Sequence, residues 1–251
     1  MLLNIILAVL VGILLQTHTV SSGNSAVMIP VVNDSEPAHD SNSEAVNDDC
    51  ISPKRICLDP GHIIGTGSGN RTYFGESESE IVWVMALMLE SRLTELGYEV
   101  IKTRTDPYED MTLPERSEIA NAFAADLFLS LHCDLGGVSG YAFFVPDVPG
   151  RNEDKAGPPR EISRRSRELA ELLDQEIQEV GPIKSRGVKS EELTYAGGTQ
   201  NALTISIYAE VPIITLELGF LDNETDGPFL TSAAGKILWV EALVQAINEV
   251  L

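Results

Sequence analysis

The sequence predicts a single α/β domain in which a mostly parallel central sheet is covered by helices on both faces. Short apolar runs alternate with segments of helical periodicity from Lys54 to the C-terminus, and this alternation is typical of such a sheet. Residues 54–251 have the length of one domain and can bury a sizeable core. No internal repeat is visible in this part of the chain.

The first 53 residues are not expected to join this domain. Residues 1–16 are almost entirely apolar and small residues follow, which indicates a signal peptide, although no Lys or Arg precedes Lys54. We expect residues 1–26 to be a cleaved signal peptide or an uncleaved N-terminal anchor. Residues 27–53 are polar and acidic without periodicity, which predicts a disordered linker. The domain is therefore expected outside the cytoplasm (secreted, periplasmic or wall-associated), touching a membrane only through an uncleaved N-terminal segment.

The first half of the domain contains two strands and two helices. A β-rich run at 55–58 precedes a Gly-rich loop, and apolar residues from Ile81 to Leu96 then recur at helical spacing until Gly97 ends the helix. Residues 98–103 alternate apolar and polar side chains like a strand. Thr112-Leu113-Pro114-Glu115 is a capping box that starts a helix of about 13 residues.

The second half continues the alternation. The apolar runs are expected to form strands, and the amphipathic segments are expected to form helices. The expected strands are 126–131, 141–145 and 212–218, the expected helices are 161–180, 196–209 and 232–250, and 146–160 is a polar loop. Gly197 and Gly198 weaken the helix at 196–209. The loop at 146–160 follows two of these strands, and we expect it to border a substrate cleft.

The charge of the chain excludes some partners. The net charge is −21, and six of the 38 acidic residues lie in the linker, so the folded part has 17 basic and 32 acidic residues. Binding to nucleic acid needs clustered Lys and Arg, because these side chains neutralise the phosphates. A domain with a net charge of −15 is therefore expected to bind neither nucleic acid nor an anionic membrane surface.

Three apolar runs lead into residues that can bind a metal ion. His62 follows the run at 56–58 and a Pro-Gly turn, His132 follows the run at 127–131, and Glu217 ends the run at 213–217. The carboxyl ends of parallel strands meet at one edge of the sheet, where ligands gather. No other histidine occurs after residue 54. The pattern predicts one shared site, and a metal ion is its simplest occupant.

A catalytic zinc site normally has three protein ligands and leaves a fourth position for water. Besides Glu217, the candidates for the third ligand are Glu76, Glu78 and Glu80 at the start of the first helix. Carboxylates at a helix N-terminus are common because they complement the helix dipole. The spacing alone leaves open which carboxylate binds the metal and which one transfers protons.

The three cysteines are Cys50, Cys57 and Cys133. An odd number permits one disulfide and one free thiol in an exported protein, and the sequence does not indicate which pair. Cys133 follows His132, but adjacent side chains of a strand point to opposite faces of the sheet. We therefore do not expect Cys133 to bind a metal together with His132.

Four motifs lie in order along the domain. They are Leu58-Asp59-Pro60-Gly61-His62, Glu78-Ser79-Glu80, Ser130-Leu131-His132 and Glu217-Leu218-Gly219-Phe220-Leu221-Asp222-Asn223. Four shorter stretches accompany them: Thr103-Arg104, Glu115-Arg116, Ala120-Asn121 and Arg186-Gly187-Val188-Lys189. Together they resemble the zinc-dependent N-acetylmuramoyl-L-alanine amidase family of the amidase-3 type, whose members cut peptidoglycan. The resemblance covers about residues 54–250.

The resemblance implies a set of roles. One zinc ion (Zn2+) per chain is bound by His62, Glu78 and His132, and Glu217 is catalytic. Glu78 fits the ligand position better than Glu76 because its interval to Gly97 matches the family. The implied reaction hydrolyses the amide between the lactyl group of N-acetylmuramic acid and L-alanine, with Glu217 moving a proton from water to the leaving amine. The implied partner is peptidoglycan, and the resemblance leaves room for a protein activator.

Two departures from the family pattern affect the expected activity. The family usually has Gly-His-Gly-Gly where this chain has Ile63 and Ile64 after His62, and it usually has Asn where this chain has Asp134. Neither change removes an implied ligand or Glu217, so we expect an altered specificity or rate. Two alternatives stay open, a zinc exopeptidase of related fold and a wall-binding module with a decayed site.

Overall fold

The structure is a computed structural model that describes residues 52–67, 69–71 and 74–251. The expected signal peptide or anchor (1–26), Cys50 and nearly all of the expected linker (27–53) lie outside the described residues. Within the described part of the chain, no helix combines the length and apolar character that a membrane span requires.

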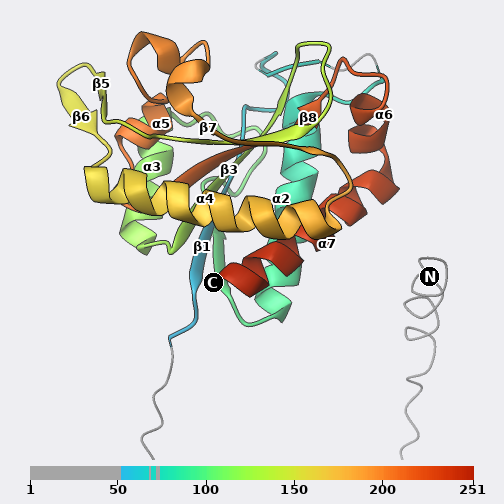
Figure 1. The fold of residues 1–251 in the computed structure, drawn as a ribbon, viewed down its shortest axis with the longest axis horizontal. Coiled ribbons are helices and arrows are strands. Elements are labelled where there is room, and N and C mark those ends of the chain that lie inside the picture. Colours follow the sequence, from blue (N-terminus) through green and yellow to red (C-terminus); the bar gives the residue numbers. More distant parts are fainter. Residues whose placement is uncertain (1–51, 68, 72–73) are drawn as a thin grey trace, which may run out of the picture. The chain divides into compact units, whose positions relative to one another are not determined.

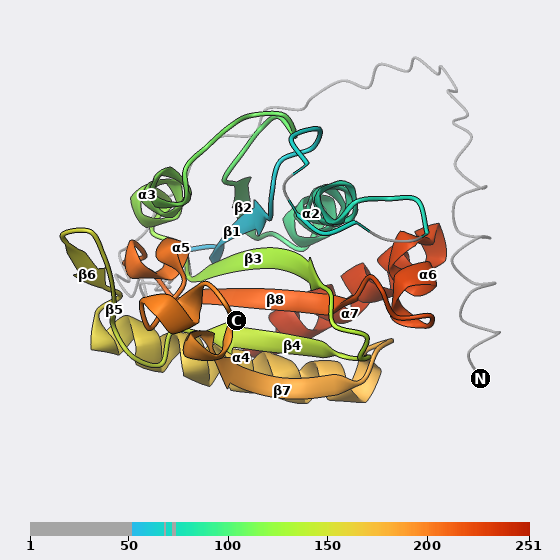
Figure 2. The same ribbon diagram turned by 90° about the horizontal axis from the view of Figure 1, so that it is seen from above.

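The core of the domain is a six-stranded sheet with the order β2-β1-β3-β8-β4-β7 (Figures 1 and 2). Four neighbouring strands are parallel, namely β2 (Glu99–Lys102), β1 (Arg55–Pro60), β3 (Leu127–Asp134) and β8 (Ile213–Phe220). β4 (Tyr141–Val145) runs antiparallel to β8, and β7 (Ser185–Ser190) is parallel to β4. The mostly parallel sheet predicted from the sequence is confirmed.

Helices cover both faces of this sheet, as predicted. α2 (Glu78–Glu95), α4 (Arg160–Val180) and α7 (Ala233–Val250) pack on one face and bury the larger apolar cluster. α3 (Leu113–Phe123) and the short α5 (Thr204–Ile207) pack on the other face over a smaller cluster. The second face is therefore covered by less helix than the first.

The alternation of side chains along β3 places His132 on this second face. Leu127, Leu129, Leu131 and Cys133 all belong to the larger cluster, whereas Phe128 belongs to the smaller one. Successive side chains of a strand point to opposite faces, so His132 shares the face of Phe128. Cys133 is fully buried on the α2 side, away from His132, as the sequence predicts.

Helix caps fix where two of the helices begin. Ser77 caps α2 in a capping box with Glu80, and Thr112 caps α3 in a capping box with Glu115. Gly97 has a φ of 91°, a left-handed conformation that favours glycine just after a helix end. The expected box at 112–115 and the expected helix end at Gly97 are therefore both present.

Several expectations for the second half of the domain are corrected. The expected loop at 146–160 contains a hairpin of β5 (Gly150–Asn152) and β6 (Lys155–Gly157). Residues 196–209 form the 3-10 turn η2 (Gly197–Thr199) and α5 instead of one helix, because glycines interrupt the helical pattern. The remaining short elements are the 3-10 turn η1 (Glu191–Leu193) and the helix α6 (Asp226–Thr231).

Strand β7 is not among the expected strands. Its sequence, Ser-Arg-Gly-Val-Lys-Ser, is mostly polar, and it lies at the edge of the sheet with largely half-buried residues. An edge strand needs no alternating apolar pattern because part of its surface faces solvent. Strand β3 is also longer than expected, so His132 lies within the strand and not at its end.

We predict that Leu129→Ala lowers the free energy of unfolding by about 2–5 kcal/mol, because it opens a cavity in the larger apolar cluster. Leu129 is fully buried in β3. Leu172→Ala is the matched control, since 49% of Leu172 is exposed and its truncation should cost less than about 1 kcal/mol. Urea-induced unfolding of both variants measures the difference. Equal effects of the two changes would show that β3 is not in the core.

Candidate active site

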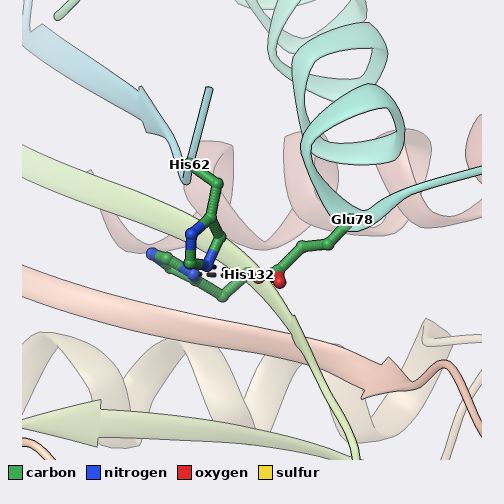
Figure 3. Close-up of side chains that lie close together, drawn as sticks. All are labelled: His62, Glu78 and His132. Carbon is green, nitrogen blue, oxygen red and sulfur yellow. Dashed lines mark hydrogen bonds and ion pairs between the residues drawn. The ribbon is translucent and has the colours of Figure 1, made fainter. Parts of the chain in front are cut away.

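The structure brings three of the residues singled out in the sequence together (Figure 3). His62 Nε2 lies 3.3 Å from Glu78 Oε2, and His132 Nδ1 lies 3.0 Å from Glu78 Oε1. The possible ligand atoms of the three side chains all lie within 4.8 Å of one another. In the described part of the chain, no other group of three His, Cys, Asp or Glu side chains comes this close.

Two glycines make room for the imidazole rings. A Cβ on Gly61 would lie 2.3 Å from His132 Cε1, and a Cβ on Gly69 would lie 2.8 Å from His62 Cγ. Gly69 also has a φ of 83°, which favours glycine. His62 itself has a φ of 57°, so its backbone turns sharply after β1 and its ring reaches the ring of His132, 5.0 Å away between centroids. The missing side chains at Gly61 and Gly69 therefore give the two imidazole rings the space that they occupy.

Glu78 is held from several directions at the start of α2. It is 1% exposed, and its carboxylate accepts hydrogen bonds from the backbone N–H groups of Asn70 (2.7 Å) and Cys133 (3.0 Å). Asn70 also donates from its side chain to the carbonyl of Cys133 (2.7 Å), which ties the loop to β3. Sequence reasoning missed Asn70, and the one available signal was its place in the Gly-rich loop before the three glutamates.

The other two glutamates at the start of α2 have structural partners elsewhere. The carboxylate of Glu76 pairs with Lys236 of α7. Glu80 completes the capping box with Ser77. Of the three candidates, only Glu78 lies beside His62 and His132.

Glu217 lies directly opposite His132 in the register of β3 and β8. Its Oε2 is buried and has no hydrogen-bond partner in the described part of the chain. Burial, together with the negative charges of Glu78 and Asp134, raises the pKa of Glu217 to about 8, although His132 opposes the shift. A carboxyl group with one buried, unpaired oxygen and a raised pKa is suited to proton transfer.

Glu78 and His132 stabilise each other's charges. Burial alone would raise the pKa of Glu78, but the hydrogen bonds and charges of His132 and His62 outweigh burial and hold this pKa well below its usual range. Burial alone would lower the pKa of His132, but the hydrogen bond and charge of Glu78 raise it to about 9.

A buried polar network lies beneath the loop that carries His62. Asp59 accepts hydrogen bonds from Thr103 Oγ1 (2.7 Å), Ser130 Oγ (2.7 Å) and Arg116 Nη1 (3.1 Å). Burial would raise the pKa of Asp59, but Arg116 and the two hydroxyl groups outweigh it and lower this pKa. Arg104 donates to the carbonyl of Pro60. The network holds in place the turn between β1 and His62. It also explains structurally why Thr103, Arg104 and Arg116 occur in the Thr103-Arg104 and Glu115-Arg116 stretches.

A cavity of about 390 Å³ opens beside the two histidines, on the α3 and α5 side. Its walls are mainly apolar and include Ile63, Leu113, Ala196, Leu203 and Ile205. The segment 146–160, expected to border the cleft, is not among the residues that line the cavity. Its hairpin instead packs behind the lining, since a Cβ on Gly150 would meet Ala202 and one on Gly157 would meet Ile207.

The domain is an α/β protein whose sheet edge brings two imidazoles and a carboxylate together as a possible metal site, with Glu217 opposite His132. Residues 56–249 match the N-acetylmuramoyl-L-alanine amidase family Amidase_3. The chain belongs to this family, as its four motifs predict. Membership assigns the domain N-acetylmuramoyl-L-alanine amidase activity, a hydrolysis in cell-wall peptidoglycan.

Individual relatives agree with this assignment. The chain is 30% identical over 182 residues to the N-acetylmuramoyl-L-alanine amidase Rv3717 of Mycobacterium tuberculosis, covering 72% of this chain and 71% of that protein. The apo N-acetylmuramyl-L-alanine amidase of Mycobacterium abscessus has the same fold, with a TM-score of 0.64, 23% identity and coverage of 79% and 99%. The CwlD amidase of Clostridioides difficile, solved with the GerS lipoprotein, has a TM-score of 0.60, 25% identity and coverage of 78% and 97%.

We predict that Asp59→Ala lowers the free energy of unfolding by about 3–5 kcal/mol, because it leaves the Arg116 guanidinium buried without its counter-ion. The control is Asp147→Ala, which removes the partner of the partly exposed Arg167 and should cost about 1 kcal/mol or less. Urea-induced unfolding compares the two variants. A small loss for Asp59→Ala would show that the network does not hold the turn before His62.

Proposed function

We propose that the protein is a zinc-dependent N-acetylmuramoyl-L-alanine amidase in which His62, Glu78 and His132 bind one zinc ion and Glu217 transfers protons. The observation that carries the proposal is the convergence of the three possible ligand atoms within 4.8 Å, with Glu217, whose Oε2 is buried, opposite His132. The lactyl carbonyl of N-acetylmuramic acid would be attacked by water, and the amine of L-alanine would leave.

The donor atoms fit zinc. Two imidazole nitrogens and one carboxylate oxygen match the three-ligand sets of catalytic zinc sites, which keep a fourth position open. The N–H groups of Asn70 and Cys133 hold the Glu78 carboxylate in place, as outer hydrogen bonds do around metal ligands. When bound there, zinc would lower the pKa of a water molecule and polarise the amide carbonyl.

The chain supplies the proton transfers. The free Oε2 of Glu217 is available to accept a proton from the attacking water and to give it to the departing nitrogen. The same carboxyl then acts first as base and later as acid. A buried group is suited to this exchange because bulk water does not compete for its proton.

The proposal includes the rest of the chain. Residues 1–26 would export the protein or anchor it, and residues 27–53 would connect them to the catalytic domain at 54–251. The domain would then meet peptidoglycan outside the cytoplasm. A protein activator is part of the proposal because the CwlD neighbour was solved in complex with the GerS lipoprotein.

We predict that chelation abolishes activity on purified peptidoglycan and that zinc restores it. The readout is newly exposed N-terminal alanine, accompanied by a metal content of about one zinc per chain. Magnesium is the control and should not restore activity, because it prefers oxygen ligands. Activity that survives complete removal of the metal would contradict the proposed cofactor.

We predict that Glu217→Gln lowers kcat by about 10²–10⁴-fold, since it removes the proton-accepting oxygen, while the zinc content stays at the wild-type level. His132→Ala should instead lose zinc. Glu179→Gln, at an exposed position of α4, is the matched control and should keep full activity. Loss of zinc from Glu217→Gln would make Glu217 a ligand, and release of free amino acids by the wild type would indicate an exopeptidase.

A further inference from the structure

Two cations stand on the open face of the sheet near the site. Arg186 and Lys189 both belong to the edge strand β7. The guanidinium of Arg186 lies 4.7 Å from the ring centroid of Phe220, and the ammonium of Lys189 lies 5.7 Å from that of Phe144. Each aromatic ring supports its cation from one side and leaves the charge directed along the sheet surface.

The strand register places Lys189 on the same face of the sheet as Glu217. Phe144 of β4 pairs with Lys189 of β7 on one side and with Thr215 of β8 on the other. Thr215 and Glu217 are two residues apart on β8, so their side chains share a face. Lys189 is therefore separated from the face of β8 that carries Glu217 by the single strand β4.

Asp134 connects the two groups of charges. Its carboxylate is close enough to interact electrostatically with Glu78 and Glu217, and it also attracts Arg186 and Lys189. In the described part of the chain, neither cation forms an ion pair with a carboxylate. Burial and the charge of Arg186 lower the pKa of Lys189, so Asp134 balances the two positive charges only in part. An additional anion would be stabilised beside them.

The two sides of the site differ in chemistry. The α3–α5 side is the mainly apolar cavity lined by Ile63, Leu113 and Leu203, whereas the β4–β7 side carries Arg186 and Lys189. The substrate has a matching asymmetry. On the glycan side of the scissile amide the lactyl carboxyl is consumed in the bond, whereas the free carboxylates of the substrate lie on the peptide side.

We propose that Arg186 and Lys189 bind a carboxylate of the stem peptide and thereby direct the peptide side of the substrate over β4 and β7. The inference rests on the proposed amidase function and adds the residues that orient its substrate. Asp134, which stands where the family usually has Asn, competes with that carboxylate for the two cations. It therefore weakens binding of the anionic peptide without touching the reacting bond.

The test compares purified peptidoglycan with the same material after its carboxyl groups have been converted to primary amides. Release of N-terminal alanine is measured as a function of substrate concentration. Arg186→Gln and Lys189→Gln should each raise the half-saturating concentration of unmodified peptidoglycan about tenfold, the loss expected for one charge-assisted hydrogen bond. The maximal rate should stay within about twofold, and activity on the amidated material should not change.

Two further variants separate the effect of charge from the effect of side-chain identity. Asp134→Asn should lower the half-saturating concentration of unmodified peptidoglycan, the opposite direction from the two Gln variants. Lys189→Arg keeps the cation and should remain near the wild type. Arg165→Gln is the matched control, because it removes an equal charge from an exposed position of α4 on the other face of the sheet. It should leave both substrates unaffected.

The outcomes separate this inference from the proposed function. If the wild type releases no alanine from unmodified peptidoglycan, the amidase proposal itself fails. If the wild type is active but the Gln variants behave like Arg165→Gln, or lose the same activity on amidated material, then Arg186 and Lys189 do not bind a carboxylate and the inference is overturned.

Discussion

The site depends on one buried negative charge, the carboxylate of Glu78. Moving an ionised carboxylate out of water costs several kcal/mol unless hydrogen bonds and opposite charges compensate. Here the compensation comes from three directions, the Asn70 N–H of the loop after β1, the Cys133 N–H of β3 and the rings of His62 and His132. The start of α2 adds its dipole. Because these partners come from the loop after β1 and from β3, satisfying Glu78 at the start of α2 holds the loop, the helix and the sheet together.

Three carboxyl groups near the sheet edge acquire three different properties from their surroundings. Asp59 faces Arg116 and two hydroxyl groups, so its pKa is lowered and its role is structural. Glu78 faces two imidazoles, so it stays ionised and can act as a ligand. Glu217 has no such partner for Oε2, and burial raises its pKa to about 8. Neighbouring carboxyl groups can serve separately as acid, base or ligand when their surroundings give them different pKa values.

The sequence predicted those parts of the site that depend on local pattern. Apolar runs identified β1, β3 and β8, and their parallel arrangement explains why His62, His132 and Glu217 converge. Non-local features could not be predicted this way. Asn70 matters because it reaches β3, 63 positions away, and β7 is recognised as a strand only through its pairing with β4. From the sequence, the three glutamates at alternate positions are equivalent candidates. In the structure Glu76 pairs with Lys236 and Glu80 belongs to the capping box of α2, which leaves Glu78.

The departures from the family pattern lie beside the reaction centre and not in it. Ile63 places a large apolar side chain in the wall of the cavity next to His62, where the family usually has glycine. Asp134 adds a negative charge between the site carboxylates and the cations of β7. Both changes leave the ligand geometry and Glu217 intact, but they alter the shape of one flank and the charge of the other. Selectivity between substrates arises from such differences in flanking contacts, so we expect these two positions to alter the specificity or the rate of the reaction.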